Sequence, residues 1–231
     1  MDRPDKKSSR AGHRARLRSR FAAEGADALT ERELTELLLF YAIPQKDTAP
    51  IADSLLAHFG SIDGILSAPE QALAEVPGMT PGAAVLIPLL RQLWFRSTLE
   101  RVRGCTIRSM HHAAAVFRTL SRFADCTQVW ALLLDGGMKL RDCIPLCGRS
   151  AVSPEPAALA AMTALPGGIF LLAHQQPEGT VLPTTEDIAL TRRAFEMLKQ
   201  RQITVHDHLV ITDTDCFSMR ANGQFSMLYP I

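Results

Sequence analysis

The sequence predicts a two-domain α+β protein, in which an all-α region precedes an α/β sandwich. Up to about residue 103, apolar residues recur at helical spacing and no segment alternates with period two. From about residue 106, short continuous apolar runs alternate with helical stretches. Such runs are typical of strands that are buried on both faces. The second half is therefore expected to pack helices on a central sheet.

The composition is that of an ordinary globular protein and points to no special partner. The 231 residues are 47% apolar, and the formal net charge is +1. Five cysteines without a Cys-x-x-Cys pair predict reduced thiols rather than a disulfide framework. No apolar segment follows the basic N-terminus, and no run approaches the roughly 18 apolar residues of a membrane span. We expect a soluble, cytoplasmic protein.

Helix starts and ends can be placed in the first half. Residues 30–33 and 67–70 have the pattern of capping boxes, in which a Ser or Thr precedes a Glu by three positions. A helix is expected over residues 48–59, with Gly60 directly after its end. An apolar helix is expected from about residue 83 to residue 102.

The second half alternates strands and helices. Strands are expected at 129–134, 168–173 and 209–212, and helices near 111–122, 155–164 and 187–200. The change of pattern places a domain boundary at about 103–107. The chain is accordingly divided into a basic arm (1–20), a helical domain (21–103) and an α/β domain (106–231).

The basic arm is a candidate for nucleic-acid contact. Residues 1–20 hold eight Lys and Arg against two Asp, whereas residues 106–231 hold eleven basic and eleven acidic residues. Basic side chains bind phosphates by releasing counterions. The arginines expected to do so are Arg14, Arg16, Arg18 and Arg20. The alternative is a solvated, frayed terminus without a ligand.

The turn at residues 76–82 is a second candidate for DNA contact. It resembles a helix-hairpin-helix turn, whose Gly-x-Gly pair presents backbone N–H groups to a phosphate. Gly78 and Gly82 are present, but Thr80 stands where the second glycine is usual. A Cβ at that position restricts close phosphate approach. The alternative is a turn that serves packing only.

The most informative stretch runs from His174 to Asp187. His174 ends an apolar strand, and Thr184 and Asp187 open a helix after a Pro- and Gly-containing loop. A histidine and an aspartate brought together in this way could be two zinc ligands, although two are too few for tight binding. Alternatively, Thr184 and Asp187 form only a capping box and His174 is a polar residue at a strand terminus.

This stretch resembles the JAMM motif of bacterial RadC-like proteins, H-x-H-x7-S-x2-D. Here it reads HQQPEG followed by PTTED, with every spacing kept. The resemblance extends along the chain at His13-Arg14, Arg16-Leu17, Arg20-Phe21, Glu33-Leu34, Glu36–Leu39, Asp47-Thr48, Phe59–Ser61, Leu134-Asp135, Pro154, Asp187-Ile188, Thr191, Asp207-His208 and Gly223. It implies that the second half is an MPN (JAMM) sandwich of the cytidine-deaminase-like kind.

The resemblance also implies roles for individual residues. In active JAMM domains two histidines and an aspartate bind zinc, a glutamate is the general base, and a serine steadies the oxyanion. Here His174 and Asp187 keep the first and last ligand positions, and Gln176 stands at the second histidine. Thr184 replaces the serine but keeps its hydroxyl. Zinc is thus the cofactor that the family implies, and we expect it to be absent or weakly bound.

The general base is harder to place. Counting five residues back from Gly148 puts Cys143 at the glutamate position, and the neighbouring Asp142 is expected to point to the opposite face of the strand. Two alternatives remain for Cys143: a buried inert thiol, or a ligand in a set of Cys143, His174 and Asp187. His208 is expected only to order the loop before its strand.

Three functions follow as hypotheses. The first is a catalytically inactive JAMM domain that acts as a binding or scaffold module, with a protein partner at that domain. The second is a zinc-dependent hydrolase of the metallopeptidase kind with a modified metal site. The third is association with DNA through the basic arm and the helical domain, which is compatible with either of the others.

Overall fold

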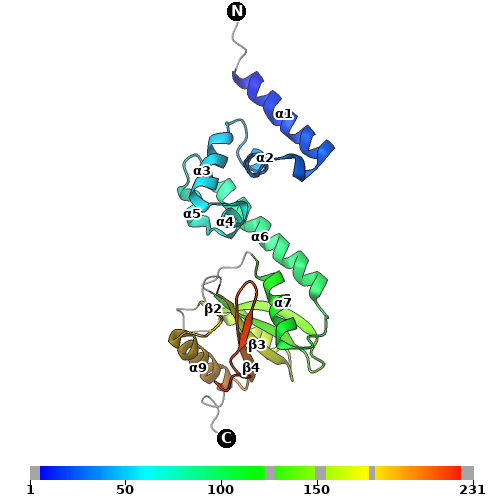
Figure 1. Ribbon diagram of the computed structural model, residues 1–231, viewed down its shortest axis with the longest axis vertical. Coiled ribbons are helices and arrows are strands. Elements are labelled where there is room, and N and C mark those ends of the chain that lie inside the picture. The colour runs from blue at the N-terminus through cyan, green and yellow to red at the C-terminus, as the bar shows by residue number, and fades with distance from the viewer. Residues whose placement is uncertain (1–5, 123–127, 149–154, 177–179, 225–231) are drawn as a thin grey trace, which may run out of the picture. The chain divides into compact units, whose positions relative to one another are not determined.

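The structure is a computed structural model that describes residues 6–122, 128–148, 155–176 and 180–224, with side chains from residue 12 (Figure 1). The chain divides into two compact units, Met1–Trp94 and Phe95–Ile231. This division falls within a helix, earlier than the change of pattern in the sequence. The reason is that Leu99, on the last turns of that helix, is buried in the core of the second unit.

The described part of the first unit is helical, as expected. Its elements are α1 (Lys6–Glu24), the 3-10 turn η1 (Ala26–Ala28), α2 (Glu31–Ala42), α3 (Ala49–Phe59), α4 (Ile62–Ser67), α5 (Glu70–Glu75) and α6 (Pro81–Val102), which continues into the second unit. Apolar residues of α2 to α6 form one core around Leu39, Leu55 and Leu73. A smaller cluster joins α1 to α2 through Leu17 and Phe40.

The capping signals of this unit are confirmed in one case and wrong in another. The Thr30 hydroxyl accepts from Glu33 N at 3.2 Å, and Glu33 Oε2 accepts from Thr30 N at 3.0 Å, so α2 begins with a capping box. Gly60 ends α3 with a φ of 80°. Ser67 does not cap α5, because it is the last residue of α4, whose own cap is Ser61.

The second unit contains a five-stranded mixed sheet. Its elements are α7 (Met110–Leu120), β1 (Gln128–Leu134), β2 (Leu140–Gly148), α8 (Pro156–Thr163), β3 (Ile169–Gln175), α9 (Thr185–Lys199), β4 (Val205–Ile211) and β5 (Cys216–Ser218). The strand order is β2-β1-β3-β4-β5. Only β3 and β4 run parallel, and α9 connects them. The α+β class and the α/β nature of the second half are thereby confirmed.

Helices cover both faces of this sheet, with α7 on one side and α9 on the other (Figure 1). On the α7 face, Phe117 packs against Leu132 and Leu171. On the α9 face, Phe195 packs with Leu133 and Leu172, together with residues of α8. The burial of alternate residues on both faces explains why the strands read as continuous apolar runs.

The described residues contain no helix that is both long enough and apolar enough to span a membrane.

Candidate metal centre at the end of strand β3

His174 and Asp187 come together on the α9 face of the sheet. His174 lies in β3, two residues after the buried Leu172, and Asp187 lies in the first turn of α9. Both side chains are buried, with exposed fractions of 1% and 3%. His174 Nε2 is 3.4 Å from Asp187 Oδ1. The structure therefore unites the two residues at the ends of the JAMM-like stretch.

Thr184 holds the Asp187 carboxylate in place. Asp187 Oδ2 accepts from Thr184 N at 2.9 Å and from Thr184 Oγ1 at 2.8 Å. In turn, Thr184 Oγ1 caps the helix by accepting from Asp187 N at 3.1 Å. The capping box considered in the sequence is thus present. It is compatible with a ligand role, because it uses Oδ2 and leaves Oδ1 facing His174.

His208 and Thr191 extend the site on the other side of His174. His208 Nε2 lies 2.9 Å from His174 Nδ1, and His208 Nδ1 lies 2.6 Å from Thr191 Oγ1. His208 and Thr191 are both fully buried. The role expected for His208, ordering a loop before the strand, is wrong, because His208 lies inside β4 and points at α9. The sequence signals for this extension are the family matches at Thr191 and Asp207-His208 and the one-turn spacing of Asp187 and Thr191.

The hydrogen-bond directions in this chain follow from Thr191. Its hydroxyl donates to the Asp187 backbone carbonyl at 2.5 Å, so it accepts from His208 Nδ1–H. A neutral His208 then accepts at Nε2 from His174 Nδ1–H. His174 Nε2 then faces Asp187 Oδ1 at 3.4 Å, where a protonated His174 forms an ion pair with the carboxylate and a neutral one turns a lone pair toward it. In the neutral form the two atoms are placed as two ligands of one cation would be.

Gln176 does not complete the set. Its backbone N donates to Ile211 O at 2.7 Å, while its side-chain Oε1 is buried without a hydrogen-bond partner. An amide oxygen is neutral and binds zinc weakly beside imidazole and carboxylate.

Cys143 lies on the opposite face of the sheet, in the core under α7. The structure does not bring it to His174 and Asp187. The cysteine on the His174 face is Cys147, which pairs with Val129, and Val129 pairs with His174 on its other side. Burial raises the pKa of the Cys147 thiol to about 11 and that of Cys143 further, so both are protonated near neutral pH.

The donor set fits a catalytic zinc only in part. Two ligands bonded at about 2.0–2.2 Å in a tetrahedron lie about 3.3–3.6 Å apart. His174 Nε2 and Asp187 Oδ1 have this spacing. However, no group of three or more His, Cys, Asp and Glu side chains in the described ranges is placed to hold a metal ion. Among the described residues, the site therefore has two strong zinc ligands and no third one placed beside them.

The four arginines of the basic arm divide into two kinds. Arg14 donates to the carbonyls of Phe40, Ile43 and Lys46, and Arg20 forms a bidentate pair with Glu33 at 2.9 and 3.0 Å. These two fasten α1 to α2. Arg16 and Arg18 are exposed on α1. The segment is thus a helix, rather than a frayed terminus, over Lys6–Glu24.

The turn at residues 76–82 is closely packed. Gly78 has a φ of 89°, and a Cβ there would lie 2.9 Å from Ile51 Cγ1, so the position requires glycine for packing alone. Thr80 Oγ1 accepts from Ala83 N at 3.2 Å and starts α6. A Cβ added to Gly82 would meet nothing within 4 Å. These contacts account for the turn without a nucleic-acid ligand, and they leave its contact with DNA a prediction.

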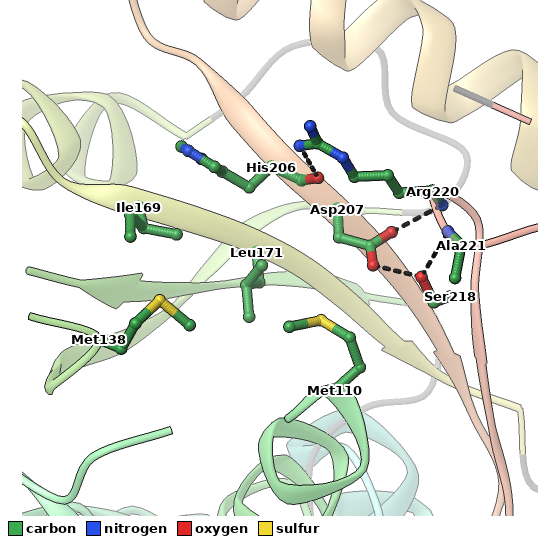
Figure 2. Close-up of a pocket in the computed structure, with 9 residues that line it drawn as sticks. All are labelled: Met110, Met138, Ile169, Leu171, His206, Asp207, Ser218, Arg220 and Ala221. Carbon is green, nitrogen blue, oxygen red and sulfur yellow. Dashed lines mark hydrogen bonds between the residues drawn. The ribbon is translucent and has the colours of Figure 1, made fainter. Parts of the chain in front are cut away.

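A separate cavity of about 440 Å³ lies on the α7 face (Figure 2). Met110, Met138 and Leu171 form its apolar wall, and Asp207, Ser218 and Arg220 lie on the other side. Asp207 is buried, and its carboxylate accepts from Ser218 Oγ, His208 N and Arg220 N. Burial raises the pKa of Asp207. The size and apolar lining are those of a ligand pocket.

A five-stranded mixed sheet between helices, with a histidine ending one strand and an aspartate opening the next helix, defines a JAB (MPN) domain. The family model described as RadC-like JAB domain matches residues 107–224. This match spans more than half of the chain, which therefore belongs to the RadC-like JAB domain family.

Proposed function

We propose that the JAB domain of this chain is catalytically inactive and acts as a binding module for a protein partner. The observation that carries this proposal is the donor set, in which Gln176 stands beside only two strong zinc ligands. Loss of a general base alone typically lowers a rate by about 10²–10⁴. Without a third ligand and a base, the site lacks the means to hold and deprotonate a water molecule.

The cavity beneath α7 supports the binding role. It lies on the other face of the sheet from His174, so a partner could occupy it without involving the JAMM-like residues. Its two methionines are flexible and polarizable, and such side chains adapt to different apolar groups. Arg220 is exposed at its edge and offers a cation to an anionic partner group.

Elemental analysis of the purified chain tests the inactive site. We expect less than one zinc per two chains and a melting temperature that does not change with chelator. The variant Gln176→His supplies the missing ligand and should hold one zinc per chain. Exposed His58 provides the matched control, because His58→Ala should change neither value.

The proposal of an inactive site is contradicted if the unmodified chain holds one zinc that is lost in His174→Ala and in Asp187→Ala but kept in His58→Ala. That result would favour the second candidate, a zinc-dependent hydrolase with a modified metal site. The observation in its favour is the 3.4 Å spacing of His174 Nε2 and Asp187 Oδ1, which is that of two ligands of one zinc ion. Zinc bound there would polarise a water molecule.

Association with DNA through α1 is a further proposal, and the exposure of Arg16 and Arg18 on this helix supports it. Binding to a DNA duplex should weaken steeply with salt, because phosphate contacts release counterions. The double variant Arg16→Ala/Arg18→Ala should bind more weakly and show a smaller salt slope. Exposed Arg101→Ala is the control. Absent or salt-insensitive binding would contradict this proposal.

A further inference from the structure

A polar cavity of about 270 Å³ lies in the helical unit, between the N-terminal half of α1, helix α2 and the segment that leads into α3. Its lining includes His13, Arg16, Glu36, Lys46 and Thr48. These residues come from three stretches of sequence that have no part in the JAB domain. The cavity is therefore a separate candidate site within the first unit.

Two buried polar atoms in this cavity have no hydrogen-bond partner. Glu36 is 1% exposed, and its Oε1 accepts from His13 Nε2 at 3.0 Å. Its Oε2 lies 3.8 Å from Arg32 Nη1, beyond hydrogen-bond distance, and has no hydrogen bond. Thr48 is also 1% exposed, and its Oγ1 has no partner. A buried polar atom without a hydrogen bond destabilises the fold, and a bound ligand that supplies the hydrogen bond removes this cost.

Thr48 is notable because it occupies the N-cap position of α3 without using its hydroxyl as a cap. Instead, the neighbouring Asp47 Oδ1 accepts from Ala49 N at 3.2 Å. The Thr48 hydroxyl therefore has no hydrogen-bond partner within the described part of the chain. A ligand that brings two adjacent hydroxyl groups would satisfy Glu36 Oε2 and Thr48 Oγ1 together.

The rim of the cavity is basic. Arg16 and Lys46 are exposed there, whereas Arg14 is already engaged by three backbone carbonyls and by the Phe40 ring, 4.5 Å from its guanidinium carbon. Asp47 is the one exposed carboxylate among the lining residues. A ligand with an anionic group would therefore place it between Arg16 and Lys46.

We propose that this cavity binds the ribose phosphate of a ribonucleotide. The 2′- and 3′-hydroxyls form hydrogen bonds with Glu36 Oε2 and Thr48 Oγ1, and the phosphate binds Arg16 and Lys46. A carboxylate that accepts from ribose hydroxyls is a common mode of nucleotide recognition. The volume, below the roughly 300 Å³ of the smallest drug-sized sites, accommodates sugar and phosphate and leaves the base outside.

Calorimetry of the full chain with AMP tests the proposal. We expect a dissociation constant below about 1 mM, a UMP value within about threefold, and a 2′-deoxy-AMP value at least about tenfold weaker. Thr48→Val keeps the shape and removes the hydroxyl, and Glu36→Gln removes the carboxylate. Each substitution should raise the dissociation constant for AMP by about tenfold or more. Glu31 is an exposed carboxylate in α2, the helix that contains Glu36, so Glu31→Gln should leave AMP binding unchanged.

Arg16 and Lys46 are exposed, so Arg16→Ala and Lys46→Ala leave the buried groups intact and should not impair folding. Each should weaken the binding of AMP. A short RNA with a free 3′ end, compared with the same RNA carrying a 3′-phosphate, distinguishes the two sources of a ribose diol. Tighter binding of the RNA with the free 3′ end indicates that the natural ligand is an RNA terminus. Weak and equal binding of both RNAs, together with tight binding of AMP, indicates a free nucleotide. No binding by either ligand, or AMP affinity unchanged in Thr48→Val and Glu36→Gln, overturns the proposal.

Discussion

The hydroxyl of Thr191 joins α9 to the histidine pair, since it lies 2.6 Å from His208 Nδ1 and donates to the Asp187 carbonyl. Thr191→Val keeps the shape of the side chain and removes the hydroxyl that is hydrogen-bonded to a fully buried imidazole nitrogen. We predict a loss of about 1–3 kcal/mol in the free energy of unfolding. Denaturant titration of the purified variant measures this change.

The control for this prediction is Thr119→Val. Thr119 also donates to a carbonyl one turn earlier, at 3.0 Å, but it is exposed on α7. Water can replace its hydrogen bond, so we expect a change within about 0.5 kcal/mol. Equal losses in the two variants would show that Thr191 contributes nothing through His208.

The position of a single site residue could be predicted from the sequence only where its neighbours in space are also its neighbours in the chain. The proximity of His174, Thr184 and Asp187 could be predicted, because a strand end and a helix start within one short stretch contain all three. The face of Cys143 could not be predicted, because the register shifts between Val129 and Trp130 and inverts the faces along β2. Counting back from Gly148 assumes an unbroken alternation and therefore places Cys143 on the wrong face.

Among the elements, α2 begins with a capping box that the sequence predicts and the structure contains. Its residue Glu33 binds Arg20 and the Thr30 backbone, and these bonds lower the pKa of Glu33 from 4.5 to about 2. Because the folded pKa is the lower one, Glu33 stabilises the fold above pH 4.5. This contribution is lost as the pH falls from about 4.5 to about 2.

Glu33→Gln should therefore flatten the fall in melting temperature between pH 5 and pH 2.5. The pair is partly exposed and therefore screened by solvent, so the difference should be small and should shrink with added salt. Glu31 is an exposed carboxylate in the same first turn of α2, and Glu31→Gln is the control. Parallel acid profiles for Glu33→Gln and the unmodified chain would contradict the prediction.

Helices and strands could be predicted where a short segment of sequence contains the whole signal for them. The capping box at Thr30 and the apolar runs of β1 and β3 were sufficient to place their elements. The Ser67 box failed because Ser61 starts a helix that ends at Ser67. The short strand β5 (Cys216–Ser218) has no apolar run, since only its pairing with β4 makes it a strand.

For the whole molecule, the two classes of domain were predictable, but the extent of the second unit was not. The family match begins at residue 107, whereas the compact unit begins at Phe95. The added segment belongs to the core of that unit. Leu99 is 6% exposed, and the Phe95 and Trp130 rings lie 5.4 Å apart. Helical periodicity continues through α6 and gives no sign that its last turns pack on a sheet.

The segment after α6 is also tied to the sheet by its backbone. Gly104 N donates to Leu140 O at 2.7 Å, and Leu140 N donates to Cys105 O at 3.0 Å. A fragment of residues 95–231 keeps these bonds and should unfold cooperatively. A fragment of residues 107–231 loses them together with Leu99, and burying one leucine contributes about 1.5–3 kcal/mol. We therefore predict that the shorter fragment is less stable by roughly 3 kcal/mol or more, measured by denaturant titration of both. Fragments of equal stability would mean that the last turns of α6 are not part of the JAB domain core.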